Sequence, residues 1–438
     1  MSTSPARIAG SAWGRWPRYR HQIERVHART ADPALTAAST WLPWGNGRSY
    51  GDSCQNDGGG LLDTRGLDHF IRFDDQTGVL ECEPGVTLAD IITLCLPRGW
   101  FLPVTPGTSF VTVGGAIAND VHGKNHHRAG SFNDHVDGFE LWRSDGSRRW
   151  CSPQENSDWF AATAGGLGLT GLITRARLRL RRVPGPALAG QSRRFGDLAE
   201  FFALSATGDR AYEYTVAWLD CVGRRRGRGI YMAANHAQAD CAAPSGRPLS
   251  MPITPPVSLV NPLSLAAFNR LYYHRPSAEQ RDAVWHYRPF FYPLDSIYNW
   301  NRMYGPRGFF QYQCVVPMDG ARDALDALLA RISRARGGSF LAVLKVFGDR
   351  PAPGLLSFPR PGATLALDFP NTGAAVLALL DALDDIVREA GGAVYPAKDA
   401  RMPGAAFRQY FPAWQAFSDY IDPRFSSSFW RRVMDTET

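Results

Sequence analysis

Two loops in the first third of the chain combine glycines with serine or threonine, in residues 45–52 and in residues 106–109, the latter continuing to Gly114 and Gly115 in 113–118. Glycine permits positive φ angles and close backbone approach, so successive N–H groups can surround a phosphate. The second loop leads into a helix that we expect to begin near Val113, and a helix N-terminus also favours an anion. Either loop alone is typical of an ordinary turn, but two together make a phosphate-rich ligand an equal alternative to two ordinary turns.

A third glycine-rich stretch, residues 166–171, fits the G-x-G-x-x-G pattern of dinucleotide-binding sites. A Rossmann site requires this pattern to follow a strand and to open a helix. Here we expect it to follow a helix over 158–164, with Ser157 as N-cap, and to open a strand. We therefore predict no Rossmann-type NAD(P) site, although these glycines would let the backbone pass close to a flat ring.

Three histidines, His122, His126 and His127, stand within six residues. Their spacing lacks a companion carboxylate motif such as H-E-x-x-H, so we predict no metal site. We also find no pattern that indicates a Ser-His-Asp or Cys-His arrangement, although such groups can converge from distant parts of a sequence.

Polar groups also interrupt the apolar segments near the C-terminus. Gln311 and Gln313 share one face of an expected strand, and Lys345 lies on another mostly apolar strand. By residue type alone, Lys345 is typical of an edge strand whose amine reaches solvent. Lys398 is typical of a surface ion pair. A functional role is the alternative for both lysines.

The elements that would position these groups are clearest from residue 309 onward. We expect strands over 309–316, 340–347 and 363–369, helices over 320–336 and 373–390, and a last strand at 394–395. This βαββαβ order is that of a ferredoxin-like antiparallel sheet with helices on one face. The other face, which carries the two glutamines, is free to cover a ligand.

The first 183 residues favour short strands and tight turns. Hairpins are expected over 69–82 and 136–151, and Thr87 with Asp90 forms a capping pattern for a helix. Alternating arginines predict a half-buried strand over 174–180. Residues 184–300 read as irregular, and no internal repeat is visible. The fold class is therefore α+β.

Composition narrows the function further. Apolar residues make up 44% of 438, enough for a large core in two domains, and the net charge of +7 suits an anionic ligand. We find no basic stripe that would indicate nucleic-acid binding. Seven scattered cysteines without a C-x-x-C motif suggest a reducing compartment. Without a visible secretory signal or membrane span, we expect a cytoplasmic protein, with peripheral attachment to the inner membrane as an open alternative.

Several longer segments carry a family resemblance. The strings Gly47–Asp52, 106–108, 112–118 and His122–His127 resemble the FAD-binding pattern of the vanillyl-alcohol oxidase superfamily. Within it, the chain is similar to the subfamily that oxidises a polyprenyl-phospho-ribose. The similarity continues through 129–132, 292–295, 300–306 and 397–399, and is weakest over 185–290.

The resemblance implies a split FAD-binding domain, made from residues 1–183 and completed by 393–438, with a substrate domain over 184–392. The residues implied to contact FAD are Gly47, Arg48, Ser49, Tyr50, Gly51, Pro106, Gly107, Thr108, Thr112, Gly114, Gly115, Ala118, His122, Gly123, Asn125, Gly130, Gly168 and Tyr395. The substrate pocket is implied at Trp218, Tyr292, Gln311, Gln313, Lys345 and Ala366. The implied catalytic set is Lys398, Lys345, His122, Gln313 and Tyr50.

Two positions depart from the wider family. Many superfamily members tether FAD to a histidine in the first glycine loop, where this chain has Arg48, so we expect non-covalent FAD. The best-studied drug target of the subfamily has an active-site cysteine where this chain has Ala366. Inhibitors that bond to that thiol should fail here, while catalysis should survive.

The implied reaction is oxidation of the ribose C2 hydroxyl to a ketone, the first half of epimerisation to arabinose. Lys398, or else Lys345, would act as base, unless Lys398 stays charged and anchors the phosphate. A quinone or O2 would accept the electrons, and a short-chain reductase would complete the epimerisation. The alternatives are an oxidase of a soluble sugar, alditol or glycoside, and a flavin-free binding or scaffold protein.

A basic cluster, Arg224–Arg228, and an apolar stretch over 252–265 raise the question of membrane contact. Docking onto a membrane that holds the substrate is one interpretation. A solvated loop beside a partly buried cover is the other, and the sequence does not decide between them.

Overall fold

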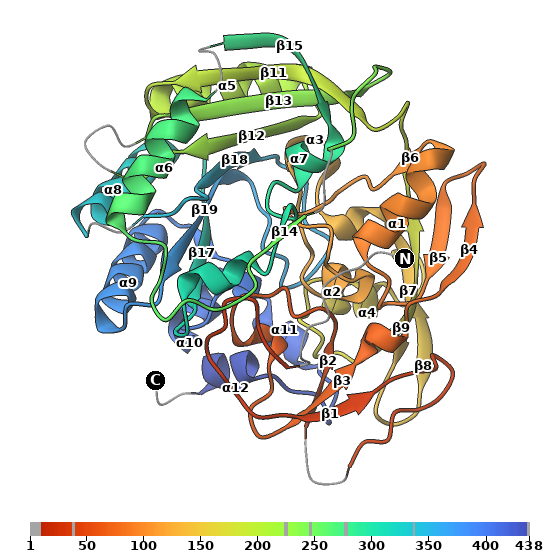
Figure 1. The fold of residues 1–438 in the computed structure, drawn as a ribbon. Coiled ribbons are helices and arrows are strands. Elements are labelled where there is room, and N and C mark those ends of the chain that lie inside the picture. The colour runs from red at the N-terminus through yellow and green to blue at the C-terminus, as the bar shows by residue number, and fades with distance from the viewer. Residues whose placement is uncertain are drawn as a thin grey trace.

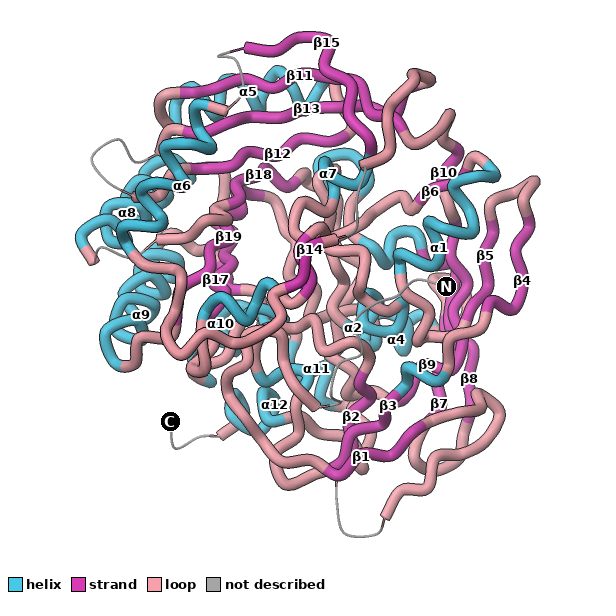
Figure 2. The backbone as a smooth tube through the Cα atoms, in the orientation of Figure 1, coloured by secondary structure: helices cyan, strands magenta, loops and turns pink. Residues whose placement is uncertain are grey.

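The computed structural model describes residues 10–36, 40–222, 227–244, 248–275, 279–335 and 338–435. Two large antiparallel sheets dominate these residues (Figures 1 and 2). The five-stranded sheet has the order β4 (Phe70–Asp74), β5 (Val79–Cys82), β9 (Leu172–Arg179), β7 (Val136–Trp142), β8 (Arg148–Cys151). The eight-stranded sheet has the order β15 (Glu279–His286), β11 (Ala187–Phe195), β13 (Gly229–Ala237), β12 (Tyr214–Leu219), β18 (Val343–Phe347), β19 (Gly362–Pro370), β17 (Phe309–Val316), β20 (Ala393–Val394).

The C-terminal half of the eight-stranded sheet forms the βαββαβ unit that the sequence predicts. Helices α8 (Ala321–Arg334) and α9 (Ala374–Glu389) alternate with its strands, which pair antiparallel in the spatial order β20-β17-β19-β18. Phe310, Tyr312 and Cys314 pack in one buried cluster with the leucines of both helices. The opposite face of β17, with its two glutamines, is therefore left for another layer. The expected strand start at residue 340 is wrong by three residues, since β18 begins at Val343.

The other half of this sheet corrects the expectation of irregular structure over 184–300. Strands β11, β12, β13 and β15 have the spatial order β15-β11-β13-β12, the same order as in the C-terminal unit. Helix α5 (Leu198–Ala211) contacts β11, β12 and β13, and the two units join where β12 pairs with β18. This repeat of topology has no counterpart in the sequence, because strand order depends on pairing between distant segments.

Helix α6 (Pro262–His274) departs from that repeat, since it does not follow α5 onto the strands. Its Tyr272 ring lies 4.9 Å from the ring of Trp218, and its Asn269 donates a hydrogen bond to Asp220. In Figure 1 it crosses in front of the strands rather than lying between the layers.

The N-terminal elements follow their local signals. The hairpins β4–β5 and β7–β8 form as expected, and Thr87 and Asp90 make a complete capping box on α1 (Leu88–Cys95). Helix α2 (Val113–Ala118) begins where predicted, and α4 (Ser157–Thr163) precedes the 166–171 loop, which leads into β9. The predicted N-cap is wrong by one residue, because Asn156 and not Ser157 occupies that position.

The last residues return to the N-terminal part of the chain. Figure 1 shows α11 (Trp414–Ser418) and α12 (Ser428–Met434) beside the small parallel sheet of β1 (Gln22–Arg25), β3 (Gly60–Asp63) and β2 (Trp41–Trp44), with α10 (Gly404–Tyr410) nearby. The Trp41 amide donates to the Arg424 carbonyl at 2.7 Å, and the Ser428 amide donates to the Gln55 carbonyl at 2.8 Å.

Two features bear on the membrane question. Of the predicted basic cluster, residues 224–226 lie outside the described residues, and the Arg228 guanidinium binds the Asp220 carboxylate at 2.9 Å. Among the described residues, none of the helices combines the length and apolar character needed to cross a bilayer.

Candidate active site

A cavity of about 300 Å³ lies between the open face of the eight-stranded sheet and the glycine loops of the N-terminal region. Its volume is in the range of small-molecule sites. One wall consists of residues from both predicted glycine loops, from α2 and from Gly168. The opposite wall comes from β17, β18 and β19, and Lys398 closes one side.

The first glycine loop follows β2 and turns sharply at Gly47, whose φ is +52°. A Cβ atom there would lie 2.4 Å from the Ser11 carbonyl oxygen, so the turn requires glycine. Tyr50 donates its amide proton to the Ala397 carbonyl at 2.9 Å. The C-terminal segment that carries Lys398 is thereby fixed to the loop.

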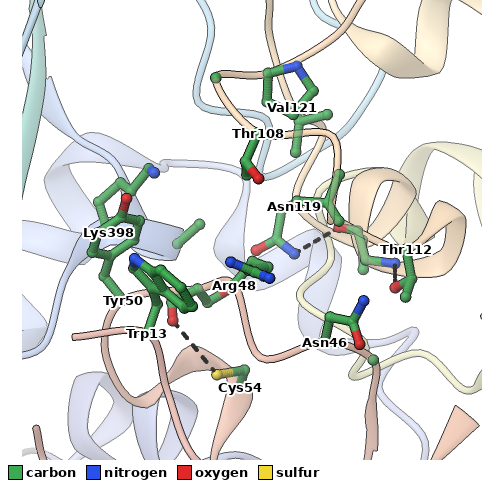
Figure 3. A pocket seen from close by; sticks show the side chains of 18 of the residues that line it. Trp13, Asn46, Arg48, Tyr50, Cys54, Thr108, Thr112, Asn119, Val121 and Lys398 are labelled. Atoms are coloured by element: carbon green, nitrogen blue, oxygen red, sulfur yellow. Dashed lines mark hydrogen bonds between the residues drawn. The ribbon is translucent and has the colours of Figure 1, made fainter. Parts of the chain in front are cut away.

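Arg48 extends from this loop into the middle of the cavity (Figure 3). Its guanidinium carbon lies 4.2 Å from the ring centroid of Trp13 and 5.2 Å from that of Phe110. Its buried Nε has no hydrogen-bond partner within the described part of the chain. Burial lowers the pKa of Arg48 to about 10, so the side chain remains a cation with hydrogen-bonding capacity to spare.

The second glycine loop is held by a carboxylate from a distant segment. Asp295 accepts hydrogen bonds from the Thr108 hydroxyl at 2.6 Å and from the Ser109 amide and hydroxyl, both at 2.7 Å. Burial raises the pKa of Asp295, and Arg48 acts to lower it. Two of the hydroxyl donors that the sequence suggests for a phosphate, Thr108 and Ser109, are thus bound by Asp295, which was not among the predicted site residues.

Helix α2 contributes Gly114 and Gly115 to the cavity wall. Its N-cap Thr112 accepts a hydrogen bond from the Gly115 amide at 3.3 Å, and the helix ends at Ala118. The next residue, Asn119, also lines the cavity and receives a 2.7 Å hydrogen bond from the Tyr395 hydroxyl on its carbonyl.

The sheet face presents a connected polar group. The Gln313 amide nitrogen lies 2.8 Å from His122 Nε2 and donates at 3.2 Å to the Thr364 hydroxyl, which in turn donates to the Cys314 carbonyl. Burial and the nearby lysines lower the pKa of His122 well below its usual value, so the ring is neutral. His122 Nε2 then accepts the amide proton, and Nδ1, which lacks a partner among the described residues, carries its own.

Both predicted lysines line the cavity. The expectation that the Lys345 amine reaches solvent from an edge strand is therefore wrong, and so is the expectation that Lys398 forms a surface ion pair. Lys345 stands on β18, between β12 and β19, and its amine donates to the Gly123 carbonyl at 3.0 Å. The Lys398 amine lies 4.0 Å from the ring centroid of Tyr50. Burial, with added repulsion between neighbouring lysines, lowers the pKa of Lys345 to about 7. Burial also lowers the pKa of Lys398 to about 8.

A buried acid lies behind this wall. Asp368, on β19, is fully enclosed and accepts a 2.7 Å hydrogen bond from the Gln311 amide. Burial raises the pKa of Asp368 to about 7, and the attraction of Lys398 opposes that rise. The same attraction favours the charged form of Lys398.

Most of the predicted site residues meet in this one cavity. The predicted residues that line it are Gly47, Arg48, Ser49, Tyr50, Pro106, Gly107, Thr108, Thr112, Gly114, Gly115, Ala118, His122, Gly123, Gly168, Tyr395, Gln311, Gln313, Lys345, Ala366 and Lys398. Their individual roles remain predictions.

Five predicted residues do not line it: Gly51, Asn125, Gly130, Trp218 and Tyr292. A Cβ at Gly51 would overlap the Asp399 carbonyl, and Tyr292 pairs with the Thr105 hydroxyl at 2.6 Å, behind the wall. Asn125 donates to the Pro103 carbonyl and to Glu213, both at 2.9 Å. Gly130 has a φ of +71°, and the Trp218 indole donates to the Phe340 carbonyl at 2.9 Å. These contacts and this backbone angle give each of the five residues a structural task.

Other lining residues were not predicted. They include Trp13, Asn46, Cys54, Asn119, Lys124, Trp300 and Thr364. Asn46 lies in the first glycine loop and Lys124 in the string His122–His127, so both could have been found there. Trp13 and Trp300 carry no local signal, because they reach the cavity only through tertiary packing. In the described ranges, no group of three or more His, Cys, Asp or Glu side chains could hold a metal ion.

Comparisons with known proteins identify the family of this chain. A family model described as an FAD binding domain matches residues 29–152. The chain is 37% identical over 410 residues to decaprenylphosphoryl-beta-D-ribose oxidase of Mycolicibacterium smegmatis, covering 89% of this chain and 88% of that protein. It is 35% identical over 369 residues to an uncharacterised protein of Streptomyces coelicolor, covering 80% of this chain and 100% of that protein. A shorter match, 34% over 110 residues, covers 25% of this chain and 21% of human Delta(24)-sterol reductase.

The FAD-binding match and the oxidase relative make this protein a flavin-dependent oxidoreductase with FAD as its cofactor. The chain belongs to the decaprenylphosphoryl-β-D-ribose oxidase family, within the vanillyl-alcohol oxidase superfamily. The flavin-free interpretation is therefore rejected.

Proposed function

We propose that this protein oxidises the C2 hydroxyl of a polyprenyl-phospho-ribose to the 2-keto sugar. This would be the first half of epimerisation to arabinose for cell-envelope arabinan synthesis. One observation carries the proposal: a single cavity brings a glycine-lined cradle against a sheet face with two lysines, a neutral histidine and two amides. The name of the M. smegmatis relative supports the choice of substrate.

The cradle fits the diphosphate of FAD. Arg48 offers a buried guanidinium whose Nε is without a partner among the described residues, and Gly114 and Gly115 leave their side of the wall free of side chains. A guanidinium is well suited to bind a phosphate. We propose that Arg48 and the two loops bind FAD without a covalent link. Acid precipitation should then release all of the flavin into the supernatant.

We propose that the FAD-binding domain comprises residues 1–183 and 393–438, with 184–392 as the substrate domain. The hydrogen bond from Tyr50 to Ala397 supports this division, since it fixes the returning segment to the first glycine loop. The sheet face of the substrate domain would then cover the flavin ring.

Bound FAD supplies the acceptor for the hydride that leaves the carbinol carbon. The chain must take up the hydroxyl proton and stabilise the charge that develops on that oxygen. Lys398 is the proposed base, with Lys345 as the second candidate. Burial lowers the pKa of both amines toward neutral pH, which favours the neutral, basic form. Gln313 holds His122 in the tautomer that presents Nδ1–H as a donor. Tyr50, below the Lys398 amine, would position it.

The reaction removes a hydride and a proton from the substrate, so the two electrons must leave through a quinone or O2. A short-chain ketosugar reductase would act next, on the 2-keto product. Because the substrate is lipid-linked, we propose a cytoplasmic protein that meets the inner membrane peripherally.

Rapid mixing of FAD-loaded protein with substrate under anaerobic conditions tests the proposal. Polyprenyl-phospho-ribose should bleach the flavin and yield a product lighter by two hydrogens. Free ribose, an alditol and a soluble glycoside should leave the flavin oxidised. Equal bleaching by a soluble sugar would replace the proposed substrate with the soluble alternative.

A further inference from the structure

The exposed large apolar side chains of this protein are concentrated in one segment. Seven of the twelve that the described residues expose lie between Leu249 and Leu271, namely Leu249, Ile253, Val257, Leu259, Leu263, Phe268 and Leu271. A monomeric protein rarely exposes such a concentration without a partner for it.

Helix α6 shows the pattern most clearly, because two leucines stand on its outer face. Leu263 is 84% exposed and Leu271 is 74% exposed, whereas Asn269 on the inner side is 1% exposed and binds Asp220 at 2.8 Å. These two leucines are eight residues apart, so they share one face of the helix. The outer face of a surface helix ordinarily carries polar residues, and not leucines.

The charged residues of the same segment are all basic. From Cys241 to Ala278 the sequence has no Asp or Glu, while it has Arg247, Arg270, His274 and Arg275. Arg270 and Arg275, near the end of α6, are exposed. Leucines beside arginines on an exposed helical face are typical of an element that lies in the interface of an anionic membrane.

The inner side of this segment abuts the cavity. Leu265 of α6 packs in one buried cluster with Trp13 and Trp300, and both tryptophans line the cavity. Strand β14 (Leu249–Ser250) pairs with β16 (Ile297–Tyr298), which follows the lining residues Pro293 and Leu294. Trp13 and Trp300 therefore connect the segment that carries the exposed apolar side chains to the wall of the cavity.

We infer that the outer face of α6, together with residues 249–259, docks this protein onto a bilayer that contains anionic lipid. The inference rests on the proposed function for the reason why the protein would bind a membrane, since a polyprenyl-linked sugar would be presented at the membrane surface. Its evidence is independent, because the apolar exposure and the missing acidic residues are properties of the chain alone.

Co-sedimentation of the full-length FAD-loaded protein with vesicles tests the inference. Vesicles of phosphatidylcholine with phosphatidylglycerol should bind the protein at least tenfold more tightly than phosphatidylcholine alone. L263E/L271E should weaken binding to the anionic vesicles at least tenfold. M318E, which changes an exposed apolar residue outside the segment, should bind like wild type. Wild-type protein that stays in the supernatant, or equal binding by L263E/L271E, would overturn the inference.

Three further experiments separate the remaining outcomes. R270E/R275E should lose the preference for anionic over neutral vesicles. If sedimentation velocity without lipid shows that L263E/L271E dissolves a wild-type oligomer, the face is a contact between copies of the chain, and the inference is wrong. Flavin bleaching by a short-chain soluble substrate analogue should be the same in L263E/L271E as in wild type. Failure of polyprenyl-phospho-ribose to bleach the flavin of the wild type would remove the proposed function and leave vesicle binding to be judged on its own.

Discussion

Two lysines face one cavity, but their surroundings differ. Lys345 is fixed to the Gly123 carbonyl, whereas Lys398 rests on the ring of Tyr50 and is attracted by the buried Asp368. Lysine is a base only when neutral, and that form prevails above its pKa. If Lys398 is the base, flavin reduction should speed up as pH rises through about 8 and level off beyond it. A rise centred near 7 would point to Lys345.

Substitution of Lys398 distinguishes the base from an anchor for the substrate phosphate. Lys398→Met should slow flavin reduction at saturating substrate by about 100-fold or more, the usual contribution of a general base. Lys398→Arg keeps the positive charge but cannot become neutral, so it should be equally slow. Stopped-flow reduction at several pH values measures both variants. Near-wild-type reduction in Lys398→Arg would make this residue an anchor.

The cavity wall offers a site for a thiol at Ala366, which lines it from β19. Inhibitors that bond to the family's active-site cysteine should leave no adduct on the wild-type protein, whereas Ala366→Cys should be labelled at residue 366. Intact-mass and peptide mass spectrometry report both results, with Cys54, a natural thiol of the same cavity, as the internal control. Flavin reduction in Ala366→Cys should stay within about threefold of wild type, because no proton or hydride passes through this position. Labelling of the wild type at Cys54 would show that the inhibitor reacts with another thiol of the cavity and is not specific for a cysteine at position 366.

At the scale of elements, two loop glycines that look alike in the sequence have different tasks. A Cβ at Gly51 would stand 1.7 Å from the Asp399 carbonyl oxygen, while a Cβ at Gly107 would meet nothing within 4 Å. Gly51→Ala should therefore destabilise the protein by about 3 kcal/mol or more through overpacking and displaced backbone. Gly107→Ala should cost less than about 1 kcal/mol. Urea unfolding compares the two variants, and equal losses would contradict the packing seen at Gly51.

Local signals explain why some elements were predictable. The capping box of α1, the hairpins and the alternation along β17 depend on residues a few positions apart. Strand β11 lacks such a signal, since Gly190 and Ser192 interrupt it. A Cβ at Gly190 would lie 1.9 Å from the Ala233 carbonyl oxygen. Only glycine therefore allows β11 to pair this closely with β13. Such a strand is recognisable only beside its partner.

At the scale of the whole molecule, Arg432 of α12 joins the two ends of the chain. It binds Asp52 at 2.7 Å and Asp399 at 3.0 Å, and both carboxylates are nearly fully buried. Arg432→Met would leave two buried acids without their cation, so it should lower the free energy of unfolding by about 3–5 kcal/mol. The exposed pair of Arg388 and Asp385 provides the control, since Arg388→Met should cost less than about 1 kcal/mol. Similar losses in urea unfolding would refute the linking role of Arg432.

A family resemblance of longer strings implied a flavin oxidoreductase, and the sequence by itself determined the glycine loops and the βαββαβ unit. These follow from φ freedom, periodicity and motif spacing, which are properties of short stretches. Tertiary structure alone decided that Lys345 and Lys398 are buried against one cavity, that Asp295 binds the Thr108 loop, and that Gly51 packs against Asp399. Burial and contact arise between segments hundreds of residues apart, and no local pattern records which partners will meet.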